Sequence, residues 1–377
     1  MQHATRNTPH SIRMPTLMGI TQSGFDPASR FRFIQFIPYL EKHGWRVDHR
    51  PNRPDRQWHS RCPGRLPRAL HYRAGRMAMW FHRYCDVRQM DAVDAVFVNR
   101  DLAGEGEELL YKPFAKSAGK MVYDFDDAIF VGPHEREVRW MCEHAGWVTP
   151  GNKYLADYAR QFTDRVTVIP TVIDTDRYLA RDYSHNGAGT ACSRPSSANG
   201  LVRVGWSGSD QSIQSTLVPN LGMLCNLQKK VDFELVVITN TMPKLPTADL
   251  RWSFVPWNER EEHLISSQLD IGIMPLKDDA FQKGKCGLKL LQYMAAGLPT
   301  VASPVGVNEE IVVPERTGLL ARNDSEWQEA LAALIRSQEM RASYGRAGRQ
   351  RCEEHYSIRR WLPVLLSLLN FVTQTKA

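Results

Sequence analysis

The sequence predicts an α/β protein built from two Rossmann-like domains that face a cleft. Segments of strand length alternate with helical segments through the first half of the chain, and the alternation restarts after residue 200. Such alternation is typical of parallel sheets covered by helices. A length of 377 residues is sufficient for two domains with full cores.

Composition sets the domain boundaries. Residues 1–14 are polar and are expected to be a disordered N-terminus, followed by a first domain over 15–180. Residues 181–200 are rich in Ser, Gly, Ala and Asn without periodicity, which predicts a flexible linker. The second domain is expected over 201–355, and an apolar C-terminal helix over 356–377.

Charge and cysteine content narrow the class of protein. The net charge of +7 suits a phosphate-bearing ligand or an anionic membrane surface, but it is too mild to indicate nucleic-acid binding. Seven cysteines are scattered without a CxxC pair, which favours a reduced, cytoplasmic protein. We find no signal-peptide core and no run of about 20 apolar residues, the length that a membrane helix needs.

The first half predicts six strands and five helices. Strands are expected over 15–20, 45–49, 94–99, 120–125, 146–150 and 166–169. Helices are expected over 30–43, 66–84, 104–117, 134–144 and 152–162. Pro38 lies inside the first helical segment and predicts a kink or an early break there.

The second half repeats the pattern. Strands are expected over 202–206, 233–239, 252–256, 271–275 and 300–303. Helices are expected over 217–229, 259–267, 324–337, 339–355 and 361–372, with a further helix that begins near residue 288.

The segment Lys283–Gly306 has the pattern of an anion site. Glycines loosen the loop before the helix, and free N–H groups with the helix dipole favour a phosphate at such a start. Lys283, Lys285 and Lys289 cluster at the same end. A solvated lysine cluster on an ordinary helix is the alternative. Ser207, Gly208 and Ser209 follow the first strand of this half, where doubly wound domains bind phosphate.

The run LLQYMAAGLPTVASPVGVNEEIV, followed by TGLLA, resembles the donor-binding region of glycosyltransferase family 4, the group 1 enzymes of GT-B fold. In that family the segment usually reads E-G-F-G-L-x-x-L-E-A-M-A-A-G-x-P-V-V. The resemblance implies that the amides of Gly287 and Leu288 face a nucleotide diphosphate. Gln292 falls on the glutamate that holds the ribose, and Gly284 on the glutamate near the donor sugar. This chain therefore resembles a subgroup that lacks the glutamate pair.

The resemblance extends to the first half. The stretch ASRFRFIQFIPYLEKHGWRV is similar to the opening of a family 4 subgroup, and it makes Arg30 and Arg32 candidates for a phosphate or acceptor contact. A pair of surface arginines is the alternative. The terminal helix is implied to cross back onto the first domain.

Three acids lie at the end of the strand expected over 120–125. Asp124, Asp126 and Asp127 are expected at the carboxyl edge of a parallel sheet, where α/β proteins bind ligands. Capping and loop hydrogen bonds could use such residues, but three acids in four positions exceed that need. We interpret Asp126 and Asp127 as catalytic groups that orient or deprotonate an acceptor hydroxyl, with Asp124 on the acceptor side. The resemblance implies no metal and no cofactor.

Residues 50–88 are unusually basic. A basic helix with Met77, Met79, Trp80 and Phe81 can lie on an anionic leaflet, at the inner face of the membrane. Packing of the apolar side, with the arginines in water, is the alternative that the mixed pattern favours.

Together these features predict a glycosyltransferase (EC 2.4) that moves a sugar from a nucleotide-diphosphate donor to a glycan or lipid-linked acceptor. The resemblance implies retention of configuration and a place in cell-surface polysaccharide synthesis. Ser207, Gly208, Ser209, Lys285, Gly287, Leu288, Lys289 and Gln292 are the expected donor-binding residues. The alternatives are a GT-B nucleotide-sugar epimerase and an inactive homologue that binds a glycan or partner.

Overall fold

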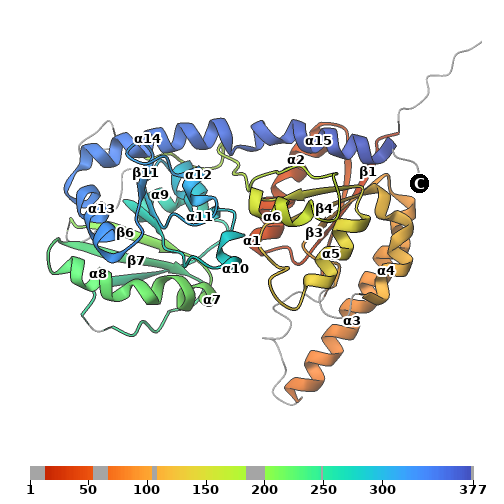
Figure 1. Ribbon diagram of the computed structural model, residues 1–377, viewed down its shortest axis with the longest axis horizontal. Coiled ribbons are helices and arrows are strands. Elements are labelled where there is room, and N and C mark those ends of the chain that lie inside the picture. Colours follow the sequence, from red (N-terminus) through yellow and green to blue (C-terminus); the bar gives the residue numbers. More distant parts are fainter. Residues whose placement is uncertain (1–12, 54–66, 104–107, 184–199, 248, 375–377) are drawn as a thin grey trace, which may run out of the picture.

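The computed structural model describes residues 13–53, 67–103, 108–183, 200–247 and 249–374. Most of the expected disordered N-terminus and of the expected linker, and part of the basic stretch, lie outside these residues. The described chain forms two α/β units, each around its own parallel sheet (Figure 1). The fold class expected from the sequence is therefore confirmed.

The first sheet has five parallel strands in the order β2-β1-β3-β4-β5. Its strands are β1 (Thr16–Thr21), β2 (Arg46–Pro51), β3 (Ala95–Asn99), β4 (Met121–Phe125) and β5 (Trp147–Pro150). Its helices are α1 (Pro27–Arg32), α2 (Ile37–Lys42), α3 (Arg68–Gln89), α4 (Glu108–Phe114), α5 (Glu135–His144) and α6 (Lys153–Ala159). Strands β3 and β4 are buried at every residue, as parallel strands covered on both faces must be.

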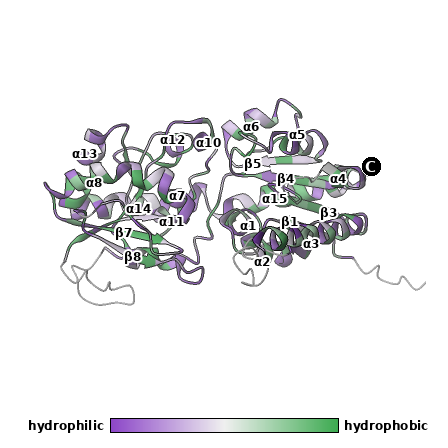
Figure 2. Ribbon diagram, turned by 90° about the horizontal axis from the view of Figure 1, so that it is seen from below, coloured by the Kyte–Doolittle hydropathy of each residue, from purple (hydrophilic) through white to green (hydrophobic). Residues whose placement is uncertain are grey.

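The second sheet has six parallel strands in the order β11-β10-β9-β6-β7-β8. Its strands are β6 (Val202–Ser207), β7 (Phe233–Thr239), β8 (Trp252–Pro256), β9 (Ile271–Met274), β10 (Thr300–Ala302) and β11 (Gly318–Leu320). Its helices are α7 (Asp210–Ser212), α8 (Leu221–Gln228), α9 (Ile265–Gln268), α10 (Ala280–Lys283), α11 (Leu288–Ala295), α12 (Asn308–Ile311), α13 (Asp324–Arg336) and α14 (Gln338–His355). Hydrophobic colour concentrates on β7 and β8 within this unit (Figure 2).

The helix predicted over 30–43 is divided. Pro38 lies in the first turn of α2, where its missing N–H costs nothing, so the break falls ahead of it, around Phe33. The break leaves Arg30 and Arg32 in the last turn of α1, and both are buried.

Helix α15 (Ile358–Gln374) follows α14, and the two run along one side of the molecule (Figure 1). Its buried Leu365 and Leu369 share one core with Leu17, Phe97 and Val122 of the first sheet. The last helix of the chain therefore packs on the first unit. No described helix is long and apolar enough to cross a bilayer.

Candidate functional site

The start of α11 presents unused backbone donors. Gly287 adopts a left-handed conformation, with φ of 68°, and caps the helix without a side-chain hydrogen bond. A Cβ at this position would lie 2.2 Å from Ile311 Cδ1, so both conformation and space require glycine. The first amides of α11, from Leu288 onward, have no partner within the helix and can bind an anion.

Lys289 brings a cation to the same place. Its Nζ lies 4.4 Å from the Trp206 ring centroid, and an ideal Cβ on Gly208 would lie 2.9 Å from it. Burial and the neighbouring Lys285 lower the pKa of Lys289 to about 7. No carboxylate pairs with this ammonium group anywhere in the described part of the chain. A bound anion would raise the pKa of Lys289 again and so stabilise its protonated, charged form.

The three small residues after β6 have different environments. Ser207 is buried, and its N–H donates to the Tyr293 hydroxyl at 3.0 Å. Gly208 lies beside the Lys289 ammonium group. Ser209 is exposed, and its side chain caps the three-residue helix α7 by accepting from Ser212 N. Ser207 and Gly208 therefore contact side chains of α11, whereas the side chain of Ser209 caps α7.

A partly open pocket adjoins the carboxyl ends of β6 and β8 in the second unit. Its lining includes Ser207, Trp257, Glu261, Glu262 and Gln292. Because ligand sites in open α/β sheets lie outside the carboxyl ends of the strands, this cavity is in the expected place for a nucleoside.

Arg30 reaches this cavity from the first unit. Its guanidinium group forms an ion pair with Glu262 and contacts Glu259 at 3.2 Å. It also lies 5.5 Å from the Trp257 ring centroid. Arg30 therefore joins the two units beside this pocket, instead of lying on a free surface.

Arg32 and Asp124 form a buried pair inside the first unit. The Arg32 side chain donates to both carboxylate oxygens, at 3.0 and 2.6 Å, and both side chains are 2% exposed. Asn99 and Thr149 donate to the same carboxylate. Burial raises the pKa of the Asp124 carboxyl, and Arg32 opposes this rise. The pair thus links α1 to strands β3, β4 and β5 in the interior of the first unit.

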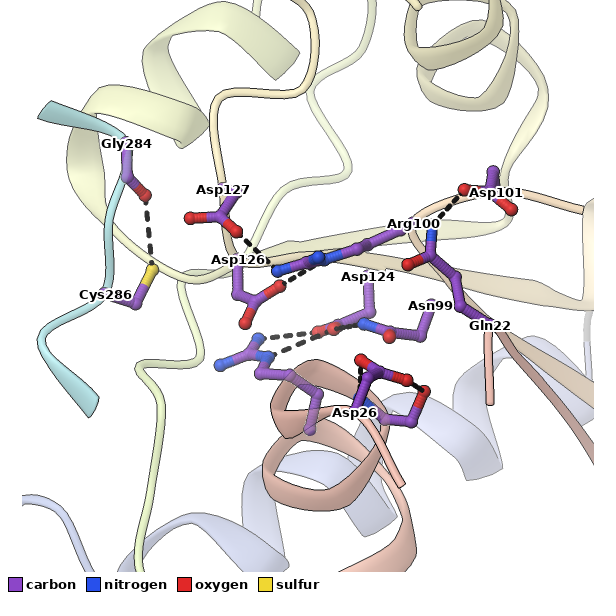
Figure 3. Close-up of polar contacts among 12 residues, drawn as sticks. Gln22, Asp26, Asn99, Arg100, Asp101, Asp124, Asp126, Asp127, Gly284 and Cys286 are labelled. Atoms are coloured by element: carbon purple, nitrogen blue, oxygen red, sulfur yellow. Dashed lines mark hydrogen bonds and ion pairs between the residues drawn. The ribbon is translucent and has the colours of Figure 1, made fainter. Parts of the chain in front are cut away.

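Asp126 and Asp127 lie above that pair and share one arginine. Arg100 donates to Asp126 at 2.8 Å and to Asp127 at 2.5 Å (Figure 3). Arg100 has a positive φ of 70°, a strained conformation for a residue with a side chain. Lys285 approaches Asp127 from the second unit at 3.8 Å. Burial raises the pKa of the Asp127 carboxyl, against the opposing charges of Arg100 and Lys285.

The loop before α11 contacts the first unit directly. Asn152 caps α6, and its amide donates to the Gly284 carbonyl at 3.0 Å. A Cβ on Gly284 would lie 2.5 Å from the backbone nitrogen of Ala128, so no side chain fits there. This contact places residues 285–289 of the second unit close to Asp126 and Asp127 of the first.

Arg100, Asn152 and Glu262 are site residues that the sequence reasoning missed. The signal for Arg100 was its position after a predicted strand, one strand from the acids at the same sheet edge. Glu262 carried no signal beyond its place in the helix expected over 259–267.

Comparison with known proteins gives a family match for part of the second unit and structural matches for the fold. Residues 216–337 match the family described as "Glycosyl transferases group 1". Among curated proteins no significant match was found.

Several solved structures match nearly the whole chain. Sucrose-phosphate synthase from Thermosynechococcus elongatus is 14% identical, with a TM-score of 0.67 over 96% of this chain and 100% of its own. HepE from Anabaena, in complex with UDP and glucose, is 13% identical, with a TM-score of 0.65 over 94% and 99%. A glycosyltransferase from Rickettsia africae is 11% identical, with a TM-score of 0.60 over 96% and 100%. The chain thus has the GT-B fold, and its residues 216–337 carry the sequence pattern of the group 1 glycosyl transferases.

Proposed function

We propose that this protein is a retaining glycosyltransferase of group 1, with a nucleotide-diphosphate sugar as donor and a hydroxyl of a glycan or lipid-linked molecule as acceptor. The observation that carries the proposal is Lys289. It is a partly buried cation without an anionic partner in the described chain, and it lies beside the free amides of α11. A diphosphate supplies the missing negative charge, and the pocket at the carboxyl ends of β6 and β8 is where a nucleoside would lie.

At the donor end, the protein stabilises a leaving group. The bond between the anomeric carbon and the diphosphate oxygen breaks, and negative charge grows on the phosphate. The Leu288 amide, Lys289 and Lys285 are donors fixed before the reaction, which is the arrangement that favours a charged transition state. No metal is needed for this charge balance.

At the acceptor end, the hydroxyl oxygen forms the new bond to the anomeric carbon and must lose its proton. Asp127 is our candidate acceptor of that proton, because burial raises its pKa and makes its carboxylate a stronger base. Arg100 orients Asp126 and Asp127 together. Lys285 of the second unit contacts Asp127 of the first and would link the acceptor side to the donor phosphate.

The acceptor side also carries a surface suited to a membrane. Helix α3 projects from the first unit (Figure 1) and exposes one stripe at spacings of three and four residues. The stripe consists of Leu70, Arg73, Met77, Phe81, Tyr84 and Arg88. Met77 is 73% and Phe81 66% exposed, more than a side chain packed on its own domain would be. We propose that this stripe docks on an anionic bilayer at the cytoplasmic face, where a lipid-linked acceptor of cell-surface polysaccharide synthesis is found.

Vesicle co-sedimentation tests the stripe. We expect binding to phosphatidylglycerol-rich vesicles at low salt, and loss of binding in the double variant Met77→Ser and Phe81→Ser. Met242→Ser is the matched control, because Met242 is equally exposed, at 65%, on the second unit. Equal, negligible binding to neutral and anionic vesicles would contradict the docking proposal.

Product analysis tests the reaction. We expect a labelled sugar to move from UDP-, GDP- or ADP-sugar into a membrane lipid or glycan extract, with release of the nucleoside diphosphate only when that extract is present. Conversion of the donor sugar to an epimer without any extract would identify an epimerase. Binding without turnover under either condition would indicate an inactive homologue.

A further inference from the structure

The nucleoside cavity contains one buried carboxylate. Glu262 lines it with a side chain that is 8% exposed, whereas the neighbouring Glu261 is exposed to solvent. Gln292 lines the same wall and is 6% exposed. A ribose carries two adjacent hydroxyls that donate hydrogen bonds, and a carboxylate is acceptor-only.

We propose that Glu262 is the ribose-binding residue of this protein, with its carboxylate accepting from the ribose hydroxyls. The inference rests on the proposed function, because it needs a nucleotide in this cavity. It assigns the ribose contact to the first residue of the short 3₁₀ helix Glu262–Leu264 after β8, whereas the helix α11 supplies only the amide of Gln292.

Gln292 fits this assignment because its amide nitrogen is committed. It donates to the Tyr178 hydroxyl at 3.2 Å and points toward Glu262 at 3.5 Å. A carboxylate at residue 292 would lie beside Glu262 as a second negative charge in a buried place, which is costly. Glutamine at 292 and glutamate at 262 are therefore a matched pair, in which the amide orients the carboxylate.

Arg30 completes the arrangement from the other unit. Its guanidinium group pairs with Glu262 and contacts Glu259, with an 8% exposed side chain. Burial alone raises the pKa of the Glu262 carboxyl, and the Arg30 charge opposes this. Arg30 is thus a positioning residue that keeps the Glu262 carboxylate ionised. Because Arg30 belongs to the first unit, ribose binding then depends on the contact between the units.

Calorimetry with UDP, GDP and ADP tests the inference. The nucleotide that binds most tightly is then compared with its 2′,3′-dideoxy form. The wild-type protein should bind the ribose form about tenfold or more tightly than the dideoxy form, as expected for hydrogen bonds to a charged acceptor. In Glu262→Gln the preference should shrink to about twofold or less. Glu261→Gln, on the exposed rim of the same cavity, should keep it.

Two further variants exclude a folding defect as the explanation. Gln292→Glu should weaken binding by bringing a second carboxylate beside Glu262, and the double variant Glu262→Gln with Gln292→Glu should restore part of the ribose preference. Equal wild-type affinity for the ribose and dideoxy forms, or an unchanged preference in Glu262→Gln, would overturn the assignment while the proposed function stands. Failure of all three nucleotides to bind the wild-type protein would overturn both.

Discussion

Replacing Lys289 by methionine should stabilise the free protein and weaken the donor at the same time. Methionine keeps the length and apolar stem of the side chain but removes the ammonium group that lies over Trp206. Because that group has no anionic partner in the described chain, its charge is a cost in the free protein. The same charge stabilises the complex once a diphosphate is bound.

The stability effect can be bounded. A fall of the pKa from 10.5 to about 7 corresponds to at most ~5 kcal/mol. The side chain is partly exposed, so solvent screens much of this cost and we expect roughly 1–2 kcal/mol. For a domain of this size, Lys289→Met should therefore raise Tm by about 2–6 °C near pH 6.

The sign of the pH dependence follows from the lowered pKa. Below pH 7 both the folded and the unfolded chain hold the proton, so the full cost is present. Between pH 7 and 10.5 the folded protein releases the proton and the unfolded chain keeps it, so the wild-type free energy of unfolding rises with pH. The Tm difference between Lys289→Met and wild type should shrink over that window.

Nucleotide binding should move in the opposite direction. Loss of a charge-assisted hydrogen bond costs roughly 1.5–3 kcal/mol, so Lys289→Met should bind the nucleoside diphosphate about 10- to 100-fold more weakly at pH 6.5. Wild-type affinity should decline from pH 7 to 9, and the variant's affinity should stay nearly flat. Scanning calorimetry and titration calorimetry measure the two effects, with the exposed Lys277→Met as control. Unchanged affinity at pH 6.5 together with an unchanged or lower Tm would refute the reasoning.

The other predictions concern the first unit and its contact with the second. Arg32→Met should lower the free energy of unfolding by about 3–5 kcal/mol in a urea titration, since it leaves Asp124 buried and unpaired; a loss below ~1 kcal/mol would mean that water reaches this pair. Asp127→Asn should reduce transfer about 10²- to 10⁴-fold and leave nucleotide affinity within about threefold, as for loss of a general base; turnover close to wild type would exclude Asp127 from catalysis. Gly284→Ala should separate the two units and raise the radius of gyration in small-angle scattering, because its Cβ has no room, whereas Gly222→Ala, with open space around it, should change nothing. An unchanged scattering curve for Gly284→Ala would show that the contact yields to one methyl group.

The fold was accessible from the sequence because both sheets are parallel and their central strands are buried. Such central strands read as short apolar runs between helices, and both the buried β7 and the edge strand β8 have the bounds expected from the sequence. The three-residue β11 was missed, since Gly318–Leu320 is too short to carry a pattern. The helix over 104–117 was expected too long, because α4 ends at Phe114 and a tighter 3₁₀ segment follows.

The site was less accessible, because the pairing of charges is a tertiary property. The sequence indicated Arg32, Asp124, Asp126 and Asp127 without showing that the first two satisfy one another in the interior. Nothing local distinguishes Asp124 from Asp126. Only the register of β3 and β4 and the position of α1 decide which carboxylate meets Arg32 and which meets Arg100.

A thermal-shift panel of nucleotide sugars tests the central claim most directly. The wild-type protein is heated with UDP-, GDP- and ADP-sugars and with the matching nucleoside diphosphates, monophosphates and free nucleosides. We expect one base to raise Tm, with the diphosphate well above the monophosphate, because two phosphates reach the start of α11 and Lys289. No shift with any nucleotide sugar or diphosphate at millimolar concentration would contradict the account.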